Sequence, residues 1–301
     1  MNNPICIYHG GCADGFTAAW AVWVALGAME FYPAVYGDAP PDVAGRDVII
    51  VDFSYKRPVL EAMADSANSI LILDHHKTAE ADLAGFGVDM SKWSAPFGAD
   101  RHWLNIQQDQ YEGIQRSVYV LFDMNRSGAQ IAWDFFHPNT ERPRLVEYIA
   151  DRDLWRFELQ HSRAVSAWLY SQEFSMVTWD SCRFALHENL DQVVGQGNAI
   201  LRQHDKNVAS LIRTTAREML IGGQRVPVAN CPHFMASDVG NAMAKGKPFS
   251  ATYFDRDGSR VLSLRSHADG ADVSEIAASY GGGGHKHAAG FKMPLGWEGD
   301  E

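Results

Sequence analysis

The fold of this chain is decided by a short segment that reads Ser69-Ile70-Leu71-Ile72-Leu73-Asp74-His75-His76. Its run of aliphatic residues predicts a β-strand that is buried on both faces and ends where the polar residues begin. Two similar runs precede it, at residues 5–8, which end at His9, and at residues 47–51, which end at Asp52. Helix-length segments separate these runs, so the sequence predicts parallel strands joined by helical crossovers.

The polar residues at the ends of these strands are typical metal ligands. In a parallel sheet the carboxyl ends of neighbouring strands meet at one edge, where ligands bind. Carboxylates mixed with imidazoles suit Mn²⁺, Mg²⁺ or Fe²⁺ better than a thiolate-rich zinc site does. Two such ions can share a bridging carboxylate, which we expect to be Asp52, and can act together on a phosphoryl group. The candidate ligands are His9, Asp14, Asp52, Asp74, His75 and Asp153.

Any one of these residues has an ordinary structural explanation. A single Asp after a strand is usually a helix cap or a turn residue, and a single His is usually a satisfied surface or core group. The metal hypothesis rests on the coincidence of such residues at three strand ends.

The composition limits the range of functions. A chain of 301 residues is long enough for two domains, and its net charge of −11 disfavours tight binding to long duplex DNA. No stretch approaches the length of a membrane span. The four cysteines contain no CxxC pair, which argues against a disulfide framework or a zinc knuckle and suits a reducing cytoplasm. They are Cys6, Cys12, Cys182 and Cys231.

The pattern along the chain predicts an α/β protein with two domains. We expect a parallel-sheet N-terminal domain at residues 1–190, a connecting helix at 191–215 and a smaller α+β domain at 216–301. In the first domain, Ser127 is the expected N-cap of a helix. In the second, Gly222-Gly223 and Asp257-Gly258 predict the turns of two β-hairpins.

Residues 85–117 do not predict regular structure. Long irregular insertions in a compact domain are often lids or partner surfaces. Trp93, Trp103 and Tyr111 in this segment could stack on bases, although packing in the core is the commoner role of aromatic residues.

Taken together, these segments resemble a known family. Leu73-Asp74-His75-His76 resembles the signature of the DHH phosphoesterase superfamily, and Val51-Asp52 and residues 9–15 fall where that superfamily keeps its second and first motifs. Residues 281–290 are similar to the GGGH-x-x-AAG motif of the DHH-associated C-terminal domain, and Arg265-Ser266 is similar to the run before it. The resemblance spans nearly the whole chain, with the motifs in the same order.

The resemblance implies a role for each residue of the metal centre. His9 would bind the first metal, Asp14 and His75 the second, and Asp52 both. The DHH group itself, with its Asp and second His in orienting or supporting roles, would be the catalytic motif. It consists of Asp74, His75 and His76.

A fourth motif should supply one more ligand from the segment Asp151-Arg152-Asp153-Leu154-Trp155. Asp153 matches the Asp-x-Trp pattern of oligoribonuclease-like members better, and Asp151 is the alternative.

The first motif departs from the pattern of the family, which is His-x-Asp-x-Asp-Gly. Residues 9–15 contain one extra residue, and Cys12 replaces the first aspartate. Cys12 could bind a metal as a thiolate, which would favour softer metals, or it could be a spectator. In a third interpretation the first metal site is weak or empty. We favour a working centre with altered occupancy, because the other motifs are intact.

The C-terminal motif implies a substrate site. A glycine run allows backbone amides to approach a phosphate closely, and the basic residues could contact the distal phosphate or sugar. The residues concerned are Arg265, Ser266, Gly282, Gly283, Gly284 and His285.

These features predict a metal-dependent phosphodiesterase or phosphatase that hydrolyses short oligoribonucleotides or dinucleotides with a metal-activated water. The expected cofactors are two divalent cations, with Mn²⁺ preferred and Mg²⁺ or Fe²⁺ as alternatives. The expected partners are a short RNA or DNA oligonucleotide or a small nucleotide, not long duplex DNA and not a membrane; a homodimer is left open. Two alternatives remain, a polyphosphate or pyrophosphate hydrolase and a non-catalytic nucleotide-binding protein with a degenerate metal site.

Overall fold

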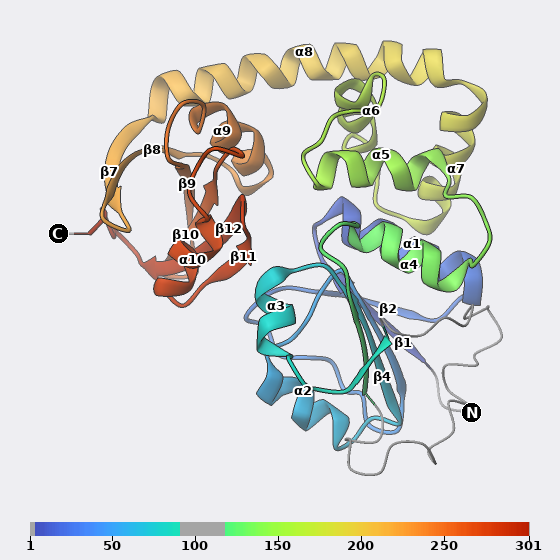
Figure 1. The fold of residues 1–301 in the computed structure, drawn as a ribbon. Coiled ribbons are helices and arrows are strands. Elements are labelled where there is room, and N and C mark those ends of the chain that lie inside the picture. Colours follow the sequence, from blue (N-terminus) through green and yellow to red (C-terminus); the bar gives the residue numbers. More distant parts are fainter. Residues whose placement is uncertain (1–3, 91–117, 301) are drawn as a thin grey trace. The chain divides into compact units, whose positions relative to one another are not determined.

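The structure is a computed structural model that describes residues 4–90 and 118–300 (Figure 1). Trp93, Trp103 and Tyr111, for which stacking on bases or packing in the core was considered, lie outside the described residues. The chain divides into two compact units, residues 1–201 and 202–301, and the boundary falls within the long helix α8 (Leu190–Thr215). The boundaries expected at residues 190 and 216 stay a prediction.

The first unit is built on a six-stranded sheet whose described strand pairs are all parallel. The order is β2-β1-β3-β4-β6-β5, so the three predicted strands lie side by side at its centre. Together with the second unit described below, this sheet confirms the expected fold class. The strands are β1 (Ile5–His9), β2 (Glu30–Ala34), β3 (Asp47–Val51), β4 (Ser69–Asp74), β5 (Val88–Asp89) and β6 (Val118–Phe122).

Alternate residues of the central strands fill two separate cores, one on each face of the sheet. Ile49 and Leu71 pack with α1 (Ala13–Leu26) and α4 (Gly128–Phe136), whereas Ile50 and Ile72 pack with α2 (Arg57–Ala64) on the other face. A continuous aliphatic run is required because a strand covered on both faces has no solvent-exposed position. The short helix α3 (Lys77–Asp82) follows the DHH segment.

Three further helices follow in the first unit before α8. They are α5 (Arg144–Asp153), α6 (Ser162–Leu169) and α7 (Met176–Glu188). The helix α5 ends at Asp153, and Trp155 and Phe157 beyond it adopt left-handed backbone angles that no α-helix accommodates.

The second unit contains a six-stranded sheet in the order β11-β12-β10-β9-β8-β7, in which β8 and β9 are parallel and the other pairs antiparallel. Both predicted hairpin turns are present, each with positive φ at its two central residues. The strand β11 within the glycine run was not predicted. The elements are β7 (Arg217–Ile221), β8 (Gln224–Asn230), a 3₁₀ turn (His233–Met235), α9 (Ala236–Met243), β9 (Ser250–Arg256), β10 (Ser259–Arg265), α10 (Val273–Ser279), β11 (Gly283–His285) and β12 (Ala288–Pro294).

Among the described residues, no helix has both the length and the apolar character needed to span a membrane.

Two glycines of α8 give opposite stability predictions. A Cβ on the buried Gly197 would lie 2.0 Å from the carbonyl oxygen of Ala164, whereas a Cβ on the exposed Gly195 would meet nothing within 4 Å. Gly197→Ala should therefore lower the free energy of unfolding by about 1–3 kcal/mol through overpacking. Gly195→Ala should raise it by up to about 1 kcal/mol, because alanine is the better helix former. Denaturant titration of both variants checks this, and equal effects would contradict the close approach of α8 to Ala164.

Candidate metal centre

The carboxyl ends of the three central strands bring the predicted ligands together. His9 ends β1, Asp52 follows β3, and His75 follows β4. Because these strands are neighbours, Asp52 lies between the two imidazoles. Its Oδ2 is 3.5 Å from Nδ1 of His9 and its Oδ1 is 3.1 Å from Nε2 of His75.

Among the described residues of the first unit, three groups of three side chains have donor atoms spaced for a metal ion, within 4.8 Å of one another. The first group is His9, Cys12 and Asp52, the second is Asp14, His75 and Asp153, and the third is Asp52, Asp74 and His76. Asp52 is thus a member of the first group and a direct neighbour of the second through His75. This is the arrangement expected of a carboxylate that bridges two ions.

Asp52 is a buried carboxylate whose neighbours at ion-pair distance are the imidazoles of His9 and His75. The residue is 1% exposed, and neither oxygen accepts a hydrogen bond of standard geometry from the described part of the chain. Its backbone is left-handed, with φ of 53°, a conformation that costs a non-glycine residue energy and that collects at functional sites. A buried charged group is expensive unless it is paired or coordinates a metal. The position therefore fits that of a metal ligand.

The N-terminus of α4 packs against two aspartates of the centre, Asp14 and Asp52. The backbone amides of Gly128 and Ala129 donate to the two carboxylate oxygens of Asp14, at 2.6 and 3.2 Å. A Cβ on Gly128 would lie 2.4 Å from Cβ of Asp52, so only glycine lets the helix approach this closely. The helix dipole also favours the negative charge of Asp14.

The charges of the centre shift its proton equilibria. Burial and the charges of Asp153 and Asp52 raise the pKa of Asp14. Burial alone would also raise the pKa of Asp52, but His75 and His9 outweigh it and hold that pKa well below its usual range. Burial would lower the pKa of His75, yet the carboxylates Asp52, Asp153 and Asp14 raise it to about 10. Without cations, protons offset the acidic charge, so cation binding is coupled to proton release.

Asp74 and His76 make up the third group together with Asp52, and they also support the centre. Asp74 is fully buried, and its Oδ1 accepts bonds from the backbone amides of His75 and His76 and lies 2.7 Å from Nδ1 of His76. Its Oδ2 accepts a bond from the hydroxyl of Ser54. The carboxylate therefore fixes the backbone of the DHH segment and the orientation of one imidazole.

The two aspartates of α5 have different positions. Oδ2 of Asp153 lies 3.6 Å from Nε2 of His75, and 26% of its side-chain surface is exposed. Asp151 is buried, and its carboxylate accepts bonds from the backbone amides of Glu158 and Leu159. Asp153 is therefore placed to be a ligand, whereas Asp151 anchors the loop after the helix.

Cys12 lies in the group with His9 and Asp52. Burial and the nearby charges of Asp52, Asp153 and Asp14 raise its pKa well above the ordinary value. Cys12 therefore remains a neutral thiol unless a cation offsets those charges. Its position fits a metal ligand, but it can ionise to a thiolate only when a metal ion is bound nearby.

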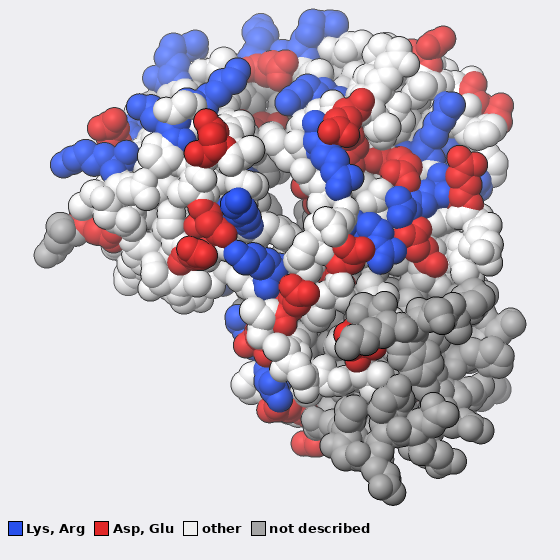
Figure 2. Space-filling model, viewed as in Figure 1, with Lys and Arg blue, Asp and Glu red and all other residues white. Residues whose placement is uncertain are grey.

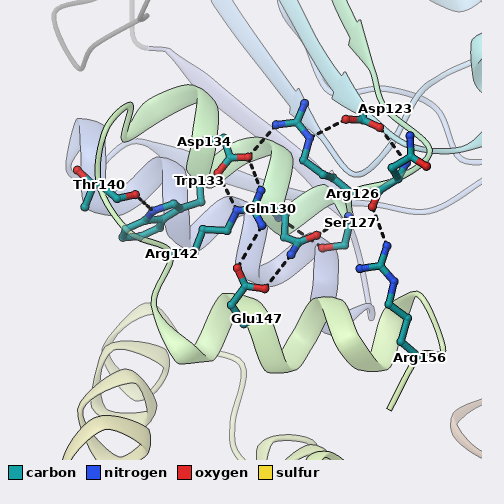
Figure 3. Close-up of polar contacts among 11 residues, drawn as sticks. Asp123, Arg126, Ser127, Gln130, Trp133, Asp134, Thr140, Arg142, Glu147 and Arg156 are labelled. Carbon is teal, nitrogen blue, oxygen red and sulfur yellow. Dashed lines mark hydrogen bonds and ion pairs between the residues drawn. The ribbon is translucent and has the colours of Figure 1, made fainter. Parts of the chain in front are cut away.

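A polar network holds α4 in place behind the centre (Figure 3). Ser127 and Gln130 form a capping box, which confirms the predicted N-cap, and Gln130 also donates to Glu147 of α5. Arg142 contacts both Glu147 and Asp134. The network links the end of α4 that binds Asp14 to the helix that carries Asp153.

The predicted substrate residues of the second unit lie at one end of its sheet. Arg265 on β10 pairs with Ala288 on β12, which in turn pairs with His285 on β11, so the Arg265 and His285 side chains extend from the same face. Arg265 donates to the hydroxyl of Ser237, and the Ser266 hydroxyl donates to the carbonyl of Ala271.

The glycines of this hairpin are tightly packed. A Cβ on Gly282 would lie 2.1 Å from the carbonyl oxygen of Gly290, and a Cβ on Gly284, whose φ is 141°, would lie 2.6 Å from that of Ala288. Gly283 pairs with Gly290 across the hairpin. Packing thus accounts for part of the glycine run, and its role in phosphate binding stays a prediction.

Sequence reasoning missed the support given by Gly128 and Ser54. Gly128 follows the expected N-cap directly, but nothing in the local pattern indicates that its missing side chain makes room for Asp52. Ser54 follows Asp52 by two residues, and no motif distinguishes it from a loop serine.

No protein-family model matches the chain. It is 26% identical over 321 aligned positions to the uncharacterized protein R106 of Acanthamoeba polyphaga mimivirus, covering 95% of this chain and 66% of that protein. It is 24% identical over 243 positions to oligoribonuclease NrnB of Bacillus subtilis (strain 168), covering 78% of this chain and 55% of that protein. The chain thus spans less than two thirds of the length of either relative.

A solved structure shows the same fold. The DHH domain of a protein described as a member of a family of ribosomal proteins superposes with a TM-score of 0.51 at 13% sequence identity. The match covers 96% of this chain and 82% of that one.

Gly128→Ala tests the close approach of α4 to Asp52. The added methyl group must displace the Asp52 carboxylate, so we expect Mn²⁺ affinity to fall by roughly 10–100-fold, as it does when support for a ligand is lost. Isothermal titration calorimetry measures this, with Gly195→Ala as the control for the same change at an open position. Unaltered affinity in Gly128→Ala would contradict a metal site that includes Asp52.

Asp134→Asn tests the network in Figure 3. Burial would raise the pKa of Asp134, but Arg142 and Arg126 outweigh it and lower that pKa. A lowered pKa gives stability that is present above the unfolded value near 4 and is lost as the pH falls through the folded value. At pH 7 the variant should lose about 1–2 kcal/mol of unfolding free energy, and the difference from the unmodified protein should shrink below pH 4.

The control for this experiment is Asp180→Asn. In the described part of the chain, the Asp180 carboxylate forms an ion pair only with Arg183, one helical turn away. That pair should contribute no more than about 0.5 kcal/mol. Denaturant unfolding between pH 3 and 7 compares the variants, and a pH-independent loss in Asp134→Asn would speak against the charged network.

Proposed function

We propose that this chain is a metal-dependent phosphoric ester hydrolase of the DHH superfamily that acts on short oligoribonucleotides or dinucleotides. The observation that carries the proposal is the Asp52 carboxylate, whose two buried oxygens face two separate groups of ligands. The similarity to an oligoribonuclease supports the class of substrate.

Two divalent cations, with Mn²⁺ preferred, would activate a water for attack on phosphorus and offset the charge of the phosphoryl group. His9, Cys12 and Asp52 would hold one cation, and Asp14, His75 and Asp153 the other, with Asp52 shared.

The remaining residues of the centre orient this arrangement. Asp74 fixes the imidazole of His76 through Nδ1, which leaves the ring in one orientation within the centre. His76 is then positioned to donate a hydrogen bond to a phosphoryl oxygen, since Asp74 also raises the pKa of that imidazole against the lowering effect of burial.

The second unit would bind the part of the substrate distal to the bond that is cleaved. Arg265 and His285 extend from one face at the same end of its sheet, a pairing suited to a phosphate group. Ser266 and the amides of Gly282, Gly283 and Gly284 complete the proposed subsite.

The distribution of charge favours a short substrate. On the face drawn in Figure 2, basic and acidic side chains are interspersed over the described surface, and the whole chain carries a net charge of −11. Binding of long duplex DNA depends on many basic contacts that displace counterions. A dinucleotide that is held by cations and a few basic residues needs far fewer basic contacts than duplex DNA does.

The state of the cysteines supports a reducing compartment. All four are free thiols, and three of them are buried. We therefore also propose a cytoplasmic location.

One observation favours a second candidate, a nucleotide-binding protein with a degenerate metal site. Cys12 lies in a ligand group, and its pKa is raised. The thiol in the His9 group would therefore ionise only when a cation is already bound there. The same experiment separates the two candidates.

The test is hydrolysis of a substrate panel with Mn²⁺, comprising RNA dimers to pentamers, cyclic dinucleotides, phosphoadenosine phosphate and polyphosphate. We expect dinucleotides or short RNA to be cleaved fastest. Asp52→Asn should reduce turnover on the order of a thousandfold or more, because the bridging charge is worth several kcal/mol in the transition state. Thermal unfolding should show that the variant remains folded.

Asp257→Asn is the control, because Asp257 is 84% exposed at a hairpin turn. Turnover by Asp52→Asn within tenfold of the unmodified protein would refute the role of the bridge. Nucleotide binding without hydrolysis of any member of the panel would favour the binding protein.

A further inference from the structure

Beside the metal centre, one arginine lies against three aromatic rings. The guanidinium carbon of Arg152 is 4.6 Å from the ring centre of Trp155 and 5.5 Å from those of Phe157 and Tyr170. Arg152 directly precedes Asp153 at the end of α5. We call Arg152, Trp155, Phe157 and Tyr170 the Arg152 cluster.

The loop that carries two of these rings is strained and firmly held. Trp155 and Phe157 have φ angles of 56° and 53°, which are rare for bulky residues and cost about 1–3 kcal/mol each. Asp151 compensates, since its carboxylate accepts from the amides of Glu158 and Leu159 and its carbonyl from that of Phe157. Strain retained in this way is typical of a functional site.

Tyr170 is the ring of the cluster that remains open to solvent. The residue is 51% exposed, whereas Trp155 and Phe157 are partly buried. Burial raises the pKa of the Tyr170 hydroxyl, Arg152 lowers it, and the charges of Cys12 and Asp153 raise it further.

Packing alone does not account for this arrangement. Aromatic residues that serve the core of the first unit, such as Trp20 and Trp179, have no exposed surface. Tyr170 instead keeps half its surface in water, with the guanidinium carbon of Arg152 5.5 Å from its ring centre. An exposed ring with an adjacent positive charge is the element that proteins use to stack an unpaired base.

We propose that Tyr170, held by Arg152, is a stacking subsite for a nucleobase of the substrate whose phosphate lies at the metal centre. The inference deepens the proposed function and rests on it for the identity of the substrate. Trp155 and Phe157 position Arg152, and Asp151 maintains the loop that carries them.

Direct binding tests the subsite without any need for turnover. Adenosine 5′-monophosphate and ribose 5-phosphate share the phosphate and the sugar but differ in the base. Calorimetry with and without Mn²⁺ should show the nucleotide binding about tenfold or more tightly, because stacking of one base contributes roughly 1–3 kcal/mol. Tyr170→Ala should remove this preference and leave the affinity for ribose 5-phosphate unchanged.

Two controls separate stacking from other effects. Tyr170→Phe keeps the ring and should keep the preference. Phe184→Ala removes a ring of similar exposure, 54%, that also lies under an arginine, with Arg183 at 4.1 Å, and it should have no effect. Thermal unfolding checks that each variant is folded, and truncation of a half-exposed ring should not prevent folding.

The outcomes distinguish this inference from the proposed function. Equal affinity for the two ligands, no measurable binding of either, or a preference that survives in Tyr170→Ala would each overturn the subsite. A base preference that depends on Tyr170 in a protein that hydrolyses none of the panel would support the subsite while the proposed activity fails.

Discussion

The first unit depends on one electrostatic constraint, the gathering of the Asp14, Asp52 and Asp153 carboxylates around a single buried imidazole. His75 lies within 3.8 Å of all three. Such a group is unstable unless positive charge neutralises it, because burial removes the water that would otherwise solvate each carboxylate. Protons on His75 and Asp14 can meet this requirement in part. Divalent cations would neutralise the carboxylates more completely, since each cation brings two positive charges to a point between the oxygens.

The backbone provides the positions that this constraint demands. The order β1-β3-β4 places three strand ends in a row, and α4 approaches closely enough for its amides to bind Asp14 because residue 128 has no side chain. Asp52 has a left-handed backbone, and its two oxygens lie near His9 and His75. The geometry of the centre is therefore set by packing between a helix end and a sheet edge.

The strand ends could be predicted from the sequence because buried parallel strands have continuous aliphatic runs, and the residue after each run faces the ligand edge. The choice between Asp151 and Asp153 followed from a family pattern, and the geometry favours the same residue. Gly128 and Ser54 could not be predicted, since their roles depend on contacts with Asp52 and Asp74 that only the folded chain creates. The glycine run was predicted to let backbone amides approach a phosphate, and the folded chain adds a second reason for glycine at residues 282 and 284, which is close packing within a hairpin.

The two aspartates of α5 show how one short segment serves both electrostatics and recognition. Asp153 extends toward His75, whereas Asp151 turns into the protein and binds the amides of the following loop. If Asp151 were a ligand, the loop would lose the acceptor that stabilises two left-handed aromatic residues, and Arg152 would lose two of its rings. Asp151 and Asp153, two residues apart, therefore have different roles. One carboxylate contributes charge to the centre, and the other holds in place the aromatic surface beside it.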